Sequence, residues 1–172
     1  MKKREDGNRR ARSIARIKFV VDRLPEGYIY PCTIQDIKEV LMEIPVENTN
    51  GIKRIRLSHQ KVTNADASYC DGTITIYSIP RDFKFIYHEK PPDSMIREYS
   101  RFGARWEVLG EHWYCYWRME HFRKYILEHV LLHELGHHSD DFHSLRRSYG
   151  KEKFAERFAL SLENKLKQER AL

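Results

Sequence analysis

Three residues in the C-terminal half have the types and the spacing of a metal-dependent hydrolytic site. They are His133, Glu134 and His137, within the segment His-Glu-Leu-Gly-His. Residues four apart lie on the same face of an α-helix, so the two histidines can bind one zinc ion. Glu134 is offset by one position and is placed to take a proton from a zinc-bound water. The pattern predicts a zinc centre with Glu134 as the general base.

The residues before this motif predict the helix that must carry it. Apolar side chains recur at helical spacing at Phe122, Ile126 and Val130, and the same stripe continues to His133 and His137. The motif is therefore expected to close a long amphipathic helix that begins near residue 118, with residues 136–141 supplying its end. On this helix we expect His129 to be a packed or hydrogen-bonded neighbour of the site, and His138 to face solvent.

The motif and its helical context resemble the zincin metallopeptidases, in which a third ligand follows the HExxH helix. The resemblance covers about residues 129–162. It implies a zinc-dependent peptidase that hydrolyses peptide bonds in a protein or peptide substrate.

Two residues are candidates for the third ligand. His143 has the spacing of the metzincin pattern HExxHxxGxxH, with Asp140 in place of the glycine. Glu152 begins a segment, residues 152–159, that looks like the ExxAxxFA segment of ImmA/IrrE-type peptidases and the ExxxD segment of gluzincins. In that resemblance Glu156, one turn later, holds the tautomer of a ligating histidine.

The last helix, expected over residues 150–167, favours Glu152 as the third ligand. Its apolar stripe consists of Ala155, Ala159, Leu162 and Leu166. A carboxylate at the start of a stripe that faces the core needs a partner, and a metal ion would be one. The two alanines are small enough for close approach to the HExxH helix. We therefore expect a gluzincin-like set of His133, His137 and Glu152, with His143 as the alternative to Glu152.

The remaining elements predict an α+β fold with a small mixed sheet, and the resemblance implies that it is a minimal zincin-like domain. Thr33 and Asp36 form a capping-box pattern for a helix that ends before Pro45. Residues 53–58 and 73–79 have strand character, and the second strand is a candidate edge for a substrate peptide. Residues 106–117 predict a hairpin. Residues 81–101 hold two adjacent prolines and mixed charge, and we expect a long loop bordering the site.

Length and charge suggest how the chain is organised. The 172 residues are enough for one domain, expected over residues 13–172. The net charge of +6 arises from the N-terminal residues, and residues 1–12 are expected to be a basic, disordered tail. The three cysteines are odd in number and far apart, which predicts free thiols. With no apolar span or signal sequence visible, we expect a cytoplasmic protein without membrane contact.

The basic N-terminus also suggests an alternative function. Lysines and arginines there could make a weak contact with nucleic acid, in a regulatory module that uses the same scaffold with little or no proteolysis. A zinc hydrolase acting on a non-peptide amide is a third possibility. The oligomeric state does not follow from the sequence.

Overall fold

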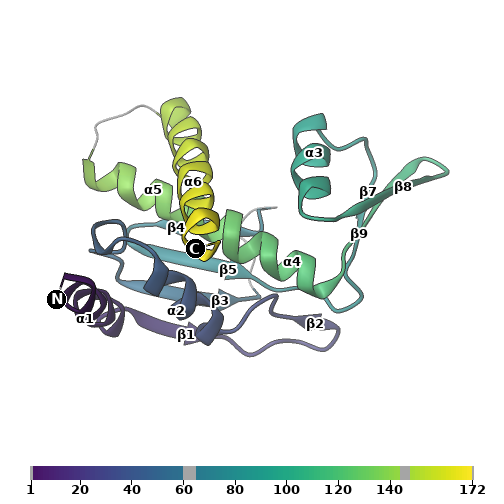
Figure 1. Ribbon diagram of the computed structural model, residues 1–172. Helices are drawn as coiled ribbons and strands as arrows, with labels where there is room; N and C mark the ends of the chain where they lie inside the picture. Colours follow the sequence, from purple (N-terminus) through teal and green to yellow (C-terminus); the bar gives the residue numbers. More distant parts are fainter. Residues whose placement is uncertain (1, 60–64, 144–147, 172) are drawn as a thin grey trace.

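The computed structural model describes residues 2–59, 65–143 and 148–171 (Figure 1). The helices are α1 (Lys2–Ala15), α2 (Ile34–Glu43), α3 (Asp93–Arg101), α4 (Met119–Tyr125), α5 (Leu131–His143) and α6 (Ser148–Arg170), with a short 3-10 helix η1 (Val46–Asn48) and a π-helix η2 (Ile126–Val130). The strands are β1 (Lys18–Val21), β2 (Tyr28–Ile29), β3 (Arg54–Ser58), β4 (Ala67–Cys70), β5 (Thr73–Tyr77), β6 (Ile79–Pro80), β7 (Lys84–Tyr87), β8 (Arg105–Leu109) and β9 (His112–Tyr116). This mixture confirms the α+β class.

The main sheet is small and mixed, as expected. Its strand order is β1-β3-β5-β4, in which β1, β3 and β5 are parallel and β4 runs antiparallel to β5. The two predicted strands are β3 and β5, and they pair Ile55 with Ile74 and Leu57 with Ile76. These four side chains are buried, which sets the register of the pair. The prediction that residues 73–79 form the sheet edge is wrong, because β4 covers β5 and is itself the edge strand.

The capped helix predicted after Thr33 is present as α2. The amide of Asp36 donates to Thr33 Oγ1 at 3.2 Å, and the amide of Thr33 donates to Asp36 Oδ2 at 2.7 Å. The helix ends at Glu43, before Pro45. Asp36 also accepts from the Arg123 guanidinium, which ties α2 to α4.

The prediction of a long loop over residues 81–101 is wrong, because these residues contain strand β7 and helix α3. Proline was taken to break structure, but Pro92 stands at the N-cap of α3, where the missing amide hydrogen costs nothing. The predicted hairpin is confirmed as β8 and β9, which join β7 in a second sheet of order β7-β9-β8. Aromatic packing holds α3 to this sheet and to α4: the ring of Tyr99 lies 5.9 Å from that of Trp106 and 5.2 Å from that of Tyr125.

The N-terminal segment also differs from expectation. Where a disordered tail was predicted over residues 1–12, the chain forms α1, and its basic residues are good helix formers. Arg10 donates to the carbonyl oxygens of Met42 and Glu43 at 3.0 and 3.3 Å. Ile14, near the end of α1, is buried against the core. These contacts fasten α1 to α2.

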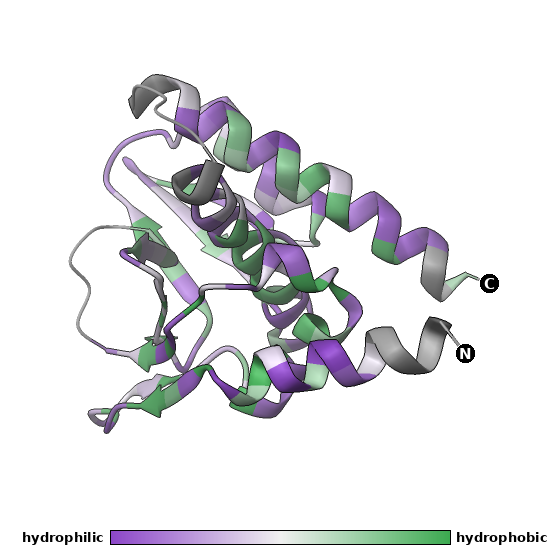
Figure 2. Cartoon of the chain, turned by 90° about the vertical axis from the view of Figure 1, so that its left-hand side faces the viewer, coloured by the Kyte–Doolittle hydropathy of each residue, from purple (hydrophilic) through white to green (hydrophobic). Residues whose placement is uncertain are grey.

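The core lies between the main sheet and the helices that cross it (Figure 1). Figure 2 shows hydrophilic and hydrophobic bands alternating along α6, as expected for a helix with one packed face. The predicted thiols are free: Cys32 and Cys115 are buried and Cys70 is exposed. Among the helices of the described residues, none is long and apolar enough to cross a membrane.

Candidate metal centre

One helical run carries the HExxH motif, and it is longer than predicted. α4, η2 and α5 follow one another from Met119 to His143. In the π-helix the amide of Leu131 bonds the carbonyl of Ile126, and such single π turns are common near functional sites. The prediction that the helix ends within residues 136–141 is wrong, because α5 continues to His143. Ser139 and Asp140, taken as end signals, are instead buried on a packed face.

A glycine allows α6 to lie directly against the motif. A Cβ atom placed on Gly136 would stand 2.7 Å from Ala155 Cα and 3.0 Å from its carbonyl oxygen. Only a residue without a side chain permits that separation. Ala155, Ala159, Leu162 and Leu166 are all buried, which confirms the predicted apolar stripe of α6. The close approach of the two helices brings the first turns of α6 over the histidines.

The side chains of His133, His137 and Glu152 converge at this point. The two Nε2 atoms lie 3.1 Å apart. Glu152 Oε2 is 3.4 Å from Nε2 of His133, and Oε1 is 3.5 Å from Nε2 of His137. The three side chains come from two helices, and they are the residues that the sequence pointed to as ligands.

These separations fit a zinc ion. Ligand atoms bound about 2.0–2.1 Å from a tetrahedral zinc stand about 3.3 Å from one another. The two nitrogens, 3.1 Å apart, are close to that value, and each has one of the two Glu152 oxygens at 3.4 or 3.5 Å. With one ligand atom taken from each residue, the three atoms lie within 4.8 Å of one another. Two imidazoles and a carboxylate are also a donor set that zinc accepts, with room for a further ligand. His133, His137 and Glu152 would hold the metal.

The alternative ligand, His143, has a side chain that lies outside the described residues. His143 is the last residue of α5. Six residues of unbroken helix place its Cα about 9 Å along the axis from that of His137 and on another face. The metzincin pattern requires the chain to turn between these positions, and α5 does not turn there.

Glu156 lies where the resemblance predicts a residue that supports the ligands. Its Oε2 is 3.6 Å from Nδ1 of His133, on the side of the ring opposite Nε2. The same oxygen is 3.8 Å from Nε2 of His129. A carboxylate facing Nδ1 favours the tautomer with hydrogen on Nδ1, which leaves Nε2 free to bind a metal.

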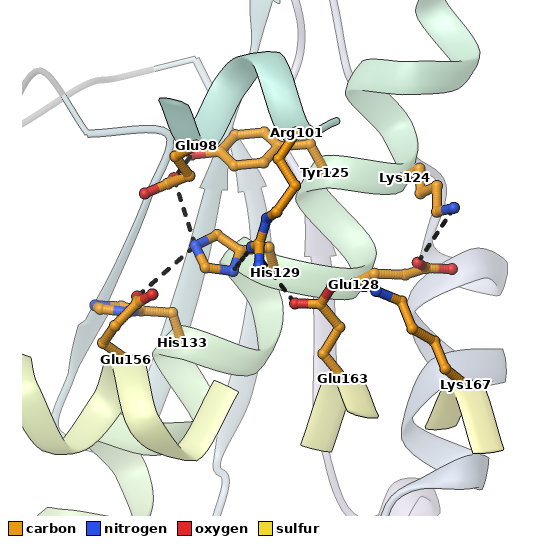
Figure 3. A network of polar contacts seen from close by, with 10 residues as sticks. All are labelled: Glu98, Arg101, Lys124, Tyr125, Glu128, His129, His133, Glu156, Glu163 and Lys167. Carbon is orange, nitrogen blue, oxygen red and sulfur yellow. Dashed lines mark hydrogen bonds and ion pairs between the residues drawn. The ribbon is translucent and has the colours of Figure 1, made fainter. Parts of the chain in front are cut away.

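His129 links this site to α3 (Figure 3). The side chain is buried, which confirms that it is a packed neighbour. Arg101 Nη2 donates to Nδ1 of His129 at 3.3 Å, and arginine has no acceptor, so the hydrogen of a neutral ring is on Nε2. Nε2 lies 3.4 Å from Glu98 Oε1. Burial alone would raise the pKa of Glu98, but the interactions with His129 and Tyr125 outweigh it and lower that pKa.

A buried carboxylate connects α3 to α6 in the same network. Glu163 is 3% exposed; its Oε1 accepts from Lys167 Nζ at 2.6 Å and its Oε2 lies 3.5 Å from Arg101 Nη2 (Figure 3). Sequence reasoning did not identify Glu98, Arg101 or Glu163. The available signal was the helical spacing of Glu98 and Arg101 after two prolines, which was taken for a loop.

The prediction that His138 faces solvent is wrong. The side chain is 2% exposed. Its Nε2 lies 2.9 Å from the carbonyl oxygen of Asn50, which can only accept, so Nε2 carries the hydrogen. Nδ1 then accepts from the hydroxyl of Tyr69 at 3.2 Å. His138 thus anchors the motif helix to β4 and to the loop before β3.

Glu134 is buried beside the two histidines. It is 7% exposed, and burial, followed by the negative charge of Glu152, raises its pKa to about 8. A carboxylate with a raised pKa is a better proton acceptor than an exposed one. The structure thus places the Glu134 carboxyl in the lining of the same cavity as His133.

A cavity of about 460 Å³ opens beside the histidines. His133, Glu134 and Glu152 line one side of it. Another side is lined by residues of α3, including Met95 and Glu98. Part of the segment 81–101, which was expected to border the site, therefore lies beside it. The volume is within the range of small-molecule and side-chain pockets.

Comparisons of the chain with protein-family models, with curated proteins and with solved structures found no match.

Proposed function

We propose that this protein is a zinc-dependent peptidase of gluzincin-like arrangement. The observation that carries the proposal is the convergence of His133, His137 and Glu152, at separations of 3.1 to 3.5 Å, with the buried Glu134 beside them. When bound, zinc would polarise a water molecule and the substrate carbonyl.

The side chains of the chain itself divide the remaining work. Glu134 accepts a proton from the attacking water molecule while the water oxygen forms a bond to the carbonyl carbon of the substrate. The same carboxyl then returns the proton to the amide nitrogen as the carbon–nitrogen bond breaks. Glu156 keeps His133 in the tautomer that presents Nε2, since it faces Nδ1 at 3.6 Å.

The sheet edge supports a peptide rather than a small molecule as substrate. β4 is the outer strand of the main sheet, and Ala67, its first residue, lines the cavity. An extended peptide that pairs with β4 would pass beside His133 and Glu134, with main-chain hydrogen bonds supplying affinity.

Replacing Glu134 by Gln tests the assignment. Glu134→Gln deletes the base without deleting a ligand, so we expect about one zinc per chain and the loss of at least about 99% of peptide cleavage. Glu120→Gln, an exposed change on the preceding helix, is the matched control and should keep full activity. Full turnover by Glu134→Gln would refute the proposal.

A further inference from the structure

The charged side chains that line the cavity beside the metal centre are mostly acidic. Five of its described lining residues are acidic: Asp66, Glu98, Glu134, Glu152 and Glu156. None of the described lining residues is a lysine or an arginine, and the two histidines His129 and His133 are the only basic ones. A bound zinc ion would offset Glu134 and Glu152. Asp66, which directly precedes β4, and Glu98, on α3, form another part of the wall.

Two buried tyrosines hold these carboxylates in place. The hydroxyl of Tyr99 donates to Asp66 Oδ2 at 3.0 Å, and that of Tyr125 donates to Glu98 Oε1 at 2.9 Å. The centroids of the two rings are 5.2 Å apart, and both carboxylates line the same cavity. Burial, and next the charge of Asp66, raise the pKa of both tyrosines, which therefore stay protonated as donors. A hydroxyl that donates to a carboxylate stabilises its charged form.

The rest of the described wall is largely apolar or aromatic, with Ser94 and the two histidines as its other polar side chains. Met95, Val130, Tyr99 and Tyr125 line the same cavity as the acidic groups. Arg101 does not line the cavity, and its guanidinium points toward His129 and Glu163 (Figure 3). An apolar surface that ends in carboxylates matches a long aliphatic side chain that ends in a cation.

We propose that this cavity is a specificity pocket that takes a lysine or arginine side chain next to the scissile bond, with Asp66 and Glu98 receiving the cationic group. The inference rests on the proposed peptidase function and names its substrate class. The buried tyrosines fix the carboxylates before substrate binds, so little ordering is needed on binding.

The substrate side of the test needs no change in the protein. The zinc-loaded full chain is given a peptide library randomised around a central bond, and then matched pairs that carry lysine or acetyl-lysine at the selected position. Acetylation removes the charge and keeps the stem. Because a charge-assisted hydrogen bond contributes about 1.5–3 kcal/mol, we expect kcat/KM for lysine to exceed that for acetyl-lysine by about 10- to 100-fold. Equal values would overturn the pocket assignment.

The protein side uses isosteric changes that keep an acceptor for each tyrosine. Asp66→Asn and Glu98→Gln should each reduce the ratio of kcat/KM for the lysine and acetyl-lysine peptides about tenfold. Glu89→Gln is the matched control, because Glu89 is exposed and does not line the cavity, and it should keep the full ratio. A ratio that is unchanged in both pocket variants would overturn the inference.

A binding measurement separates failure of the pocket from failure of the peptidase. Calorimetry of the zinc-loaded Glu134→Gln protein with the two peptides reports the pocket without turnover. Absence of cleavage by the parent protein together with lysine-selective binding that Asp66→Asn weakens would reject the peptidase and support the pocket. Equal cleavage and equal binding of the lysine and acetyl-lysine peptides would reject the pocket.

Discussion

The packing of α6 on α5 gives a quantitative test at Gly136. In Gly136→Ala the new Cβ would stand 2.7 Å from Ala155 Cα, whereas ordinary contact begins at 3.4 Å. The obstructing atoms are backbone atoms in the body of α6, so the helix must shift by roughly 0.7 Å. Overpacking costs about 1–3 kcal/mol, and replacing glycine in a helix recovers about 1 kcal/mol. We expect a net loss of up to about 2 kcal/mol in the metal-free protein.

The same shift should weaken zinc binding, because Glu152 lies one turn before Ala155 on α6. Metal ligands tolerate displacements of about 0.2 Å, so we expect zinc affinity to fall by about 10- to 100-fold. Urea unfolding in chelator gives the stability, and competition with a chromogenic chelator gives the affinity.

Gly7→Ala is the matched control for this substitution. Gly7 is also helical, and a Cβ there would meet nothing within 4 Å. It should stabilise the protein by up to about 1 kcal/mol and leave zinc affinity unchanged. If Gly136→Ala behaved like Gly7→Ala in both measurements, the seating of α6 on the motif would be refuted.

Three further predictions follow from the site. His138→Ala should lower the free energy of unfolding by about 2–3 kcal/mol, because it removes the hydrogen bonds that this side chain makes with the Asn50 carbonyl and the Tyr69 hydroxyl. The exposed His88→Ala should change the free energy of unfolding little, and equal effects in urea unfolding would contradict the anchoring role of His138. The pKa of Glu134 rises from 4.5 to about 8, so the folded metal-free protein keeps a proton that the unfolded chain loses, and stability should fall with rising pH across that window by up to about 1.4 kcal/mol per unit. The stabilisation by Glu134→Gln in chelator should therefore be larger at pH 8 than at pH 5, and a difference independent of pH would count against the buried carboxyl. Glu152→Ala should lower zinc occupancy much more than His143→Ala, and the reverse ranking in metal analysis would restore the metzincin-type ligand set.

The parts of the fold that were predictable are those set by nearby residues. The capping box at Thr33 and the alternation in β5 act within a few residues, so the pattern alone identifies the elements. The motif histidines were identified for the same reason, because their spacing along one helix places both side chains on the same face. Glu152 needed the apolar stripe of a second helix, and its alanines indicated the close packing.

The features that were missed depend on contacts between distant segments. His138 was placed in solvent because one face of α5 was assigned to the site, but the helix also packs on β4 and the Asn50 loop. Asp66 and Tyr99 are 33 residues apart and meet only once α3 has folded against the sheet edge. β4 is four residues long and carries polar side chains, so nothing in its pattern marked it as the strand beside the site.

The central claim is that Glu152, from α6, completes a zinc site with His133 and His137. The most direct measurement is a crystal structure of the zinc-loaded protein with anomalous diffraction at the zinc absorption edge. The account predicts one strong peak about 2.0–2.2 Å from Nε2 of His133, Nε2 of His137 and a carboxylate oxygen of Glu152. A peak coordinated by His143 in place of Glu152, or a strong peak away from the two histidines, would contradict it.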